Sequence, residues 1–85
     1  MTRTIRYIFV LLLILPLTTQ AQLQKIQDNL ANGKYEEAYN QINETYSGDT
    51  LNKDRLHSLY VYYLAPNNTK NDSMQAFIYA KLYNE

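Results

Sequence analysis

Apolar side chains recur at helical spacing in residues 33–46, the segment around which the chain is organised. Gly33, a helix breaker, comes first. The apolar positions then fall at i, i+3, i+4, i+7 and i+11, which is one stripe of an amphipathic helix; they are Tyr35, Ala38, Tyr39, Ile42 and Tyr46. The pattern predicts a helix from residue 34 or 35 to about Tyr46, following a tight turn at Asn32-Gly33, where glycine adopts the left-handed conformation without steric cost.

A shorter amphipathic helix is predicted before this turn, from Gln22 to Ala31. Leu23, Ile26 and Leu30 lie at i, i+3 and i+7, and the residues between them are polar. The two helices and their turn form a first predicted hairpin.

A third helix is predicted over residues 51–64. Gly48 ends the helix before it, and Asp49 or Thr50 is expected to cap the new one. Its apolar face has the spacing i, i+3, i+4, i+7 and consists of Leu56, Leu59, Tyr60 and Tyr63. Residues 59–64 are β-prone by composition, but a lone strand would have no partner in this chain, so a helix is predicted.

A fourth helix is predicted after the polar loop 65–71, from a cap at Asn71 or Asp72 to about Tyr83. Its expected apolar face consists of Met74, Phe77, Ile78 and Leu82, beside a strip of small residues at Ala76 and Ala80. The predicted fold is therefore all-α, with two helical hairpins over residues 22–85.

The N-terminal 21 residues have the layout of a cleavable signal peptide. Arg3 and Arg6 precede an apolar run at 7–15, Pro16 breaks the run, and Thr19-Gln20-Ala21 offers small residues for cleavage. An uncleaved transmembrane anchor is the alternative, although a span needs about 20 apolar residues. No cysteine follows the run, which excludes a lipoprotein anchor. We expect export to a bacterial periplasm or cell envelope, with no stable membrane span after cleavage.

Composition narrows the classes of partner. The expected mature chain, 22–85, has six basic and eight acidic residues, a net charge of about −2, and nucleic-acid binding usually needs a basic face. The chain has no cysteine, so it has no disulfide framework. Because small exported domains usually need such cross-links, its core must come from helix packing, from further chain or from a partner.

Residues 33–38, Gly-Lys-Tyr-Glu-Glu-Ala, resemble the start of the second helix of a tetratricopeptide repeat, where a Gly-x-Tyr-x-x-Ala pattern occurs. The segment 72–76 looks like the same half of a second unit. The packing residues that this resemblance implies are Gly33, Tyr35, Ala38, Ile42, Ala76 and Ala80. Ala38 and Ala76 are 38 positions apart, whereas the usual repeat has about 34 residues, and the family's Trp and Leu-Gly signature is missing. The resemblance therefore extends to a degenerate or Sel1-like hairpin repeat.

Such repeats imply a scaffold, a fragment of an α-solenoid that binds a protein or peptide in a concave groove. About three repeats are normally needed for stability, and this chain has two. We therefore expect residues 22–85 to be marginally stable alone, and to self-associate or to need further chain.

Catalysis finds little support in the residues. His57 is the only histidine, and Ser58 beside it points about 100° away on a helix. Glu36 and Glu37 are adjacent, which is typical of a solvated face. The sequence has no Gly-rich phosphate loop and no metal-ligand cluster. We predict neither an enzyme nor a cofactor or metal site, and a small hydrolase is the least supported reading.

Nine tyrosines are the unusual feature, and eight remain after the expected cleavage. Tyrosine joins an apolar ring to a polar tip and suits interfaces. The candidates for contact with a partner are Tyr39, Tyr60, Tyr62, Tyr63 and Tyr79; ordinary packing between helices is the alternative. Tyr62 lies off the predicted apolar face of its helix, which makes it the best candidate for an exposed contact.

The sequence thus favours an exported helical-repeat module that mediates protein–protein contact. The alternative is the N-terminal sensor or regulatory part of a longer cell-envelope protein.

Overall fold

The computed structural model describes residues 20–85, and this part of the chain is helical without any strand. A first helix covers 20–31 and is followed by α2 (Tyr35–Thr45), α3 (Lys53–Leu64) and α4 (Ser73–Asn84). The predicted all-α class and the order of the helices are confirmed. The expected signal peptide lies outside the described residues, except for Gln20 and Ala21, which belong to helix 20–31.

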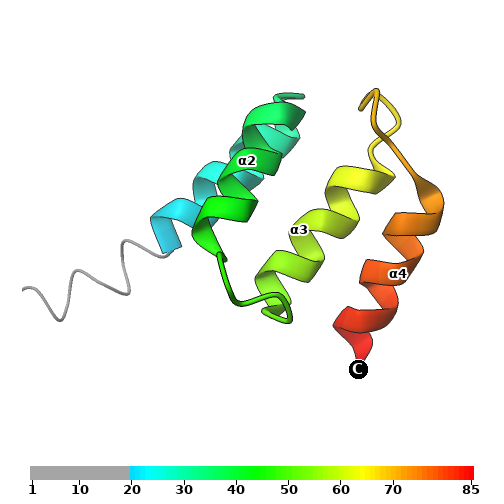
Figure 1. Cartoon of the computed structure of the whole chain (residues 1–85). Coiled ribbons are helices and arrows are strands. Elements are labelled where there is room, and N and C mark those ends of the chain that lie inside the picture. Colours follow the sequence, from blue (N-terminus) through cyan, green and yellow to red (C-terminus); the bar gives the residue numbers. More distant parts are fainter. Residues whose placement is uncertain (1–19) are drawn as a thin grey trace, which may run out of the picture.

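The helices lie side by side, with helix 20–31 against α2 and with α3 between α2 and α4 (Figure 1). One apolar cluster joins the first three helices: Ile26 comes from helix 20–31, Ile42 and Tyr46 from α2 and its end, and Leu59 from α3. All four side chains are buried. Burial of these stripes against one another is what holds short helices together in water.

Two glycines end helices as predicted. Gly33 has φ +76° and Gly48 has φ +80°, a region that L-residues with a Cβ rarely adopt. The reversal at Gly33 is held by the Lys34 backbone N–H, which donates to the Asn29 carbonyl at 2.8 Å. These turns allow the apolar faces of successive helices to meet.

The cap of α3 is not at Asp49 or Thr50, as the sequence suggested, but at Asn52. The Asn52 side-chain oxygen accepts from the backbone N–H groups of Asp54 at 2.9 Å and Arg55 at 3.2 Å. Two successive backbone turns, closed by bonds to the carbonyls of Tyr46 and Asp49, delay the start of the helix to Lys53. For α4 the predicted cap is confirmed, because the Asp72 carboxylate accepts from the N–H groups of Met74 and Gln75.

The apolar face predicted for α4 is wrong. Ala76 is buried, and Tyr79, Ala80 and Leu82 are half-buried, whereas Met74, Phe77 and Ile78 are exposed. Both sides of this helix are apolar, so spacing alone could not choose between them. The side with Ala76 and Ala80 packs inward because small side chains allow α4 to lie close to α3.

The loop 65–72 between α3 and α4 is anchored by Asn68. This side chain is buried; it donates to the Tyr62 carbonyl at 2.8 Å and accepts from the Lys70 N–H at 3.0 Å. It thereby satisfies a carbonyl in the last turn of α3 that has no partner within the helix. The sequence reasoning treated this residue only as part of a polar loop.

Lys53 connects the start of α3 to the end of α4. Its ammonium group donates to the carbonyls of Tyr83 at 2.5 Å and Leu82 at 3.5 Å, where the helix dipole favours a positive charge. It also lies 5.5 Å from the centre of the Tyr83 ring. No helix within residues 20–85 is both long and apolar enough to cross a membrane.

Candidate protein-binding site

Four tyrosines form a continuous row across three helices. The ring of Tyr39 on α2 lies 5.1 Å from that of Tyr62 on α3, and Tyr62 meets its neighbour Tyr63 edge to face at 4.9 Å. Tyr63 in turn stacks on Tyr79 of α4 at 5.8 Å with nearly parallel rings. Offset and edge-to-face pairs at these distances are favourable beyond their burial. This tyrosine row therefore fastens α2, α3 and α4 to one another.

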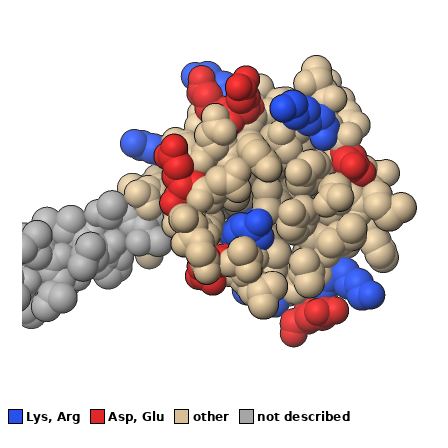
Figure 2. All heavy atoms as spheres, in the orientation of Figure 1, with Lys and Arg blue, Asp and Glu red and all other residues tan. Residues whose placement is uncertain are grey.

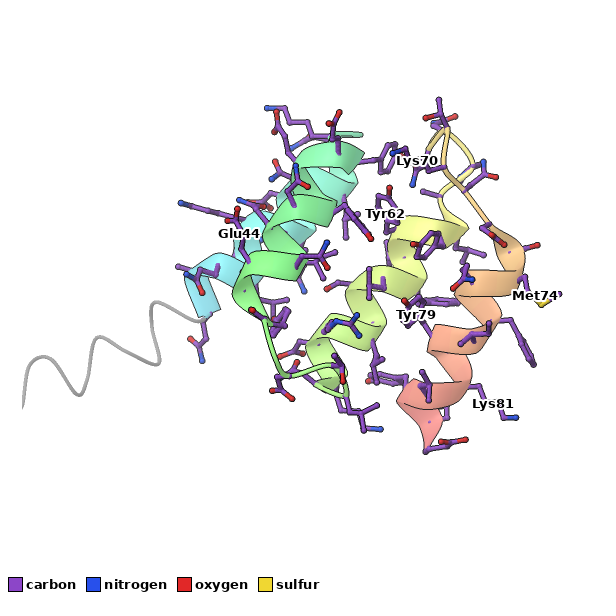
Figure 3. All side chains as sticks on the ribbon, viewed as in Figure 1. Glu44, Tyr62, Lys70, Met74, Tyr79 and Lys81 are labelled. Atoms are coloured by element: carbon purple, nitrogen blue, oxygen red, sulfur yellow. The ribbon has the colours of Figure 1, made fainter. Side chains whose placement is uncertain are left out.

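The row contains four of the five tyrosines predicted for partner contact, but it does not present them as an open groove. Tyr62 is only 3% exposed, so the prediction that it is the best exposed contact is wrong. The reason is the place of α3 between two other helices, which buries a second side of it. Figure 3 shows Tyr62 between α2 and α3, and Tyr79 between α3 and α4. The fifth tyrosine, Tyr60, is half-buried and lies 6.5 Å from the His57 ring, away from the row.

Arg55 and the buried setting of the row affect its electrostatics. The guanidinium of Arg55 lies 5.9 Å from the centre of the Tyr79 ring, where a cation is attracted to the ring face. Burial raises the pKa of the Tyr63 hydroxyl to about 12, and the other three tyrosines of the row act in the same direction. The folded chain thus favours the neutral form of Tyr63.

Stability is expected to fall at high pH through Tyr63. Its pKa is higher in the folded chain than in the unfolded chain, where tyrosine titrates near 10, so the unfolded state loses this proton first. The contribution is fully present below pH about 10 and is lost as the pH rises towards about 12. Thermal melts of the wild type between these pH values should therefore show a larger loss of stability than melts of Tyr63→Phe.

The control for this titration is Tyr83→Phe, because Tyr83 is exposed. Its melts should follow the wild type. If Tyr63→Phe lost stability with pH as steeply as the wild type does, Tyr63 would not be the group that titrates.

A polar hollow with a volume of about 1020 Å³ lies at one end of the row. It is bounded by the turn 31–37 and the loop 67–70, and Tyr39 and Tyr62 also line it. Its charged side chains, two lysines and two glutamates, are all exposed. The hollow therefore offers mixed charge without a buried polar anchor. Figure 2 likewise shows charges of both signs scattered over this face of the molecule.

An exposed apolar surface runs along α4 on the side away from α3. Met74 is 67%, Phe77 65% and Ile78 40% exposed, and together with Lys81 they follow the spacing i, i+3, i+4, i+7 of one helix face. Figure 3 shows Met74 and Lys81 on the side of α4 that points away from α3. These four residues are here named the outer face of α4. Contiguous exposed apolar surface of this kind usually marks an interaction site.

The residues that the repeat resemblance singled out lie mostly inside. Ala38, Ile42 and Ala76 are buried, Tyr35 and Ala80 are half-buried, and Gly33 sits in its turn. They pack the helices against one another and leave no side chain free for a ligand. The outer face of α4 was missed as a site, because its three apolar residues were expected in the core.

Titratable groups do not converge on a reactive centre in the described part of the chain. His57 is exposed, with its ring 5.8 Å from that of Tyr83. In residues 20–85 no three acidic or histidine side chains gather to hold a metal ion. The Tyr46 hydroxyl is buried without a hydrogen-bond partner, and burial, followed by the charge of Asp54, raises its pKa. This hydroxyl is the tip of a core side chain.

Comparison with known proteins gives no relative. No family model matches the chain, and neither a curated protein nor a solved structure matches it significantly. The geometry and the sequence pattern therefore carry the functional argument.

Proposed function

We propose that this chain is an exported helical-repeat module, similar to tetratricopeptide repeats, that binds another protein through the outer face of α4. The observation that carries the proposal is the exposure of Met74, Phe77 and Ile78 on one side of a helix whose other side is packed. Exposing three large apolar side chains in a row is unfavourable in water, and a partner that covers them gains this free energy.

The role of the tyrosines supports this choice of surface. The row from Tyr39 to Tyr79 is occupied in packing three helices together, so it supplies rigidity rather than a binding groove. A surface held on a rigid scaffold loses less conformational freedom on binding than a mobile one. The proposed division of labour is therefore a tyrosine-packed scaffold and an apolar contact on α4.

Replacing Phe77 with serine is expected to abolish capture of the partner. The tagged full-length chain would be expressed in its own bacterium and purified with its bound proteins, which are then quantified by mass spectrometry. Loss of an aromatic anchor at the centre of an interface costs about 2 kcal/mol or more, which is roughly 30-fold in affinity. Because Phe77 is exposed, circular dichroism of the variant should match the wild type.

Leu51→Ser is the matched control, because Leu51 is 68% exposed and lies outside α4. It removes a similar apolar side chain and should leave the captured protein unchanged. Equal capture by the wild type, by Phe77→Ser and by the triple variant with Met74→Ser and Ile78→Ser would show that this face binds nothing.

The proposed export rests on the charged, apolar and small-residue pattern of residues 1–21. Mass spectrometry of the exported chain is expected to find Gln22, free or cyclised, as its first residue. A chain that still begins at Met1 and is recovered in the membrane fraction would support the anchor instead.

A further inference from the structure

We infer that the outer face of α4 receives a single amphipathic helix of the partner, laid along α4 as α3 is laid along α2. This inference rests on the proposed function and adds the chemistry of what is bound. It follows from a correspondence between the two hairpins, from the size of the exposed face and from its charge.

The second hairpin repeats the first with one longer loop. α2 begins at residue 35 and α4 at residue 73, a shift of 38, and this shift also relates the buried residues Ala38 and Ala76. Helix 20–31 and α3 end 33 residues apart, at 31 and 64, and the same shift relates the buried residues Ile26 and Leu59. The difference of five residues is the difference between the loop 65–72, with eight residues, and the turn 32–34, with three.

Phe77 occupies in the second hairpin the place of Tyr39 in the first, 38 residues earlier. On α2 this position is covered by the next helix, since the Tyr39 ring lies 5.1 Å from Tyr62 of α3. On α4 the same position is 65% exposed. The contact between α2 and α3 therefore shows, within this molecule, what fits on such a face: a helix that brings an aromatic side chain against the central ring.

The size of the face favours one helix over a second copy of the chain. A standard interface buries roughly 800 Å² on each partner, which three apolar side chains cannot supply. They do supply the i, i+3, i+4, i+7 anchors by which one helix recognises another. An extended peptide binds mainly by adding a strand to a sheet edge, and residues 20–85 contain no strand.

The charge of the face predicts the charge of the partner. Lys81 is the only charged residue between Ser73 and Asn84, and it lies exposed at the end of the apolar stripe. An acidic side chain at the matching end of the bound helix would pair with it and fix the direction of docking. The bound helix is thus expected to have an aromatic or branched apolar stripe with a carboxylate at one end.

Site-specific crosslinking tests this inference. A photoreactive amino acid would replace Met74, Phe77, Ile78 or Lys81, one at a time, in the full-length chain in its own bacterium, and the attached residues of the partner would be mapped by mass spectrometry. The expected result is one partner protein, attached at residues three, four or seven positions apart. Glu44, exposed on α2 and far from α4 in Figure 3, is the control position and should give no such adduct.

A charge variant adds an independent measurement. Lys81→Glu should weaken capture several-fold, and Lys81→Arg should retain it, because only the arginine keeps the charge that pairs with the bound helix. Equal capture by both variants would overturn the predicted acidic partner.

The outcomes separate the inference from the proposed function. Attachment at partner residues two positions apart would indicate an extended segment and overturn the inference, while the proposed function would stand. Attachment to a second copy of this chain would overturn it in the same way. No adduct from any of the four positions on α4 would instead defeat the proposed function itself.

Discussion

Replacing Leu59 with alanine is expected to remove about 2–5 kcal/mol from the free energy of unfolding. Leu59 is fully buried and contributes to the one cluster that joins helix 20–31, α2 and α3. Truncation removes apolar contacts and leaves a cavity that three helices would have to close together. Domains unfold with about 5–15 kcal/mol, and small ones are marginal, so the variant should be partly unfolded at room temperature.

Urea denaturation of the wild type and of Leu59→Ala, followed by circular dichroism, measures this loss. Leu64→Ala is the matched control, because it makes the same substitution on the same helix at a side chain that is 52% exposed. Exposed substitutions usually change stability by about 0.5 kcal/mol or less. Equal losses from the two variants would mean that the cluster around Leu59 does not hold the helices together.

Replacing Ala38 with phenylalanine is expected to cost about 1–3 kcal/mol by overpacking. Ala38 is fully buried on α2, within a stripe that also contributes Ile42 to the core. A phenyl ring at this point would force the neighbouring helices apart, because protein interiors are close-packed and have no room to yield. The melting temperature should fall, by about 4–8 °C for each kcal/mol in a chain of this size.

Asn40→Phe controls for the larger side chain alone, since Asn40 is exposed on the same helix. It should leave the melting temperature nearly unchanged. An Ala38→Phe variant as stable as the wild type would show that α2 does not pack as the structure has it.

Local signals in the sequence predicted the helices well, and the reason is that each signal acts within a few residues. The glycines at 33 and 48 take positive φ, and Asp72 caps α4, as expected. Ile26, Ile42 and Leu59, which the helical spacing placed in apolar stripes, are buried. The start of α3 was missed by two residues, because Asp49, Thr50 and Asn52 are all good caps and backbone turns decide among them.

The candidate site was much less predictable. Sequence reasoning chose the tyrosines, and the structure uses four of them to pack helices. It assigned Met74, Phe77 and Ile78 to the core, and the structure exposes them. A long apolar side chain announces that something will cover it, but not whether the cover is the same chain or another one.

The sequence by itself determined the helical class, the turns and the caps, because spacing, glycine and side-chain hydrogen bonds act locally. Only the tertiary structure decided which side of α4 faces inward. Both sides are apolar, and the choice follows from the close approach that Ala76 and Ala80 allow and from the stacking of Tyr79 on Tyr63. The burial of Tyr62 and Asn68 was decided in the same way, since α3 lies between two helices and its second buried side exists only once α2 and α4 are in place.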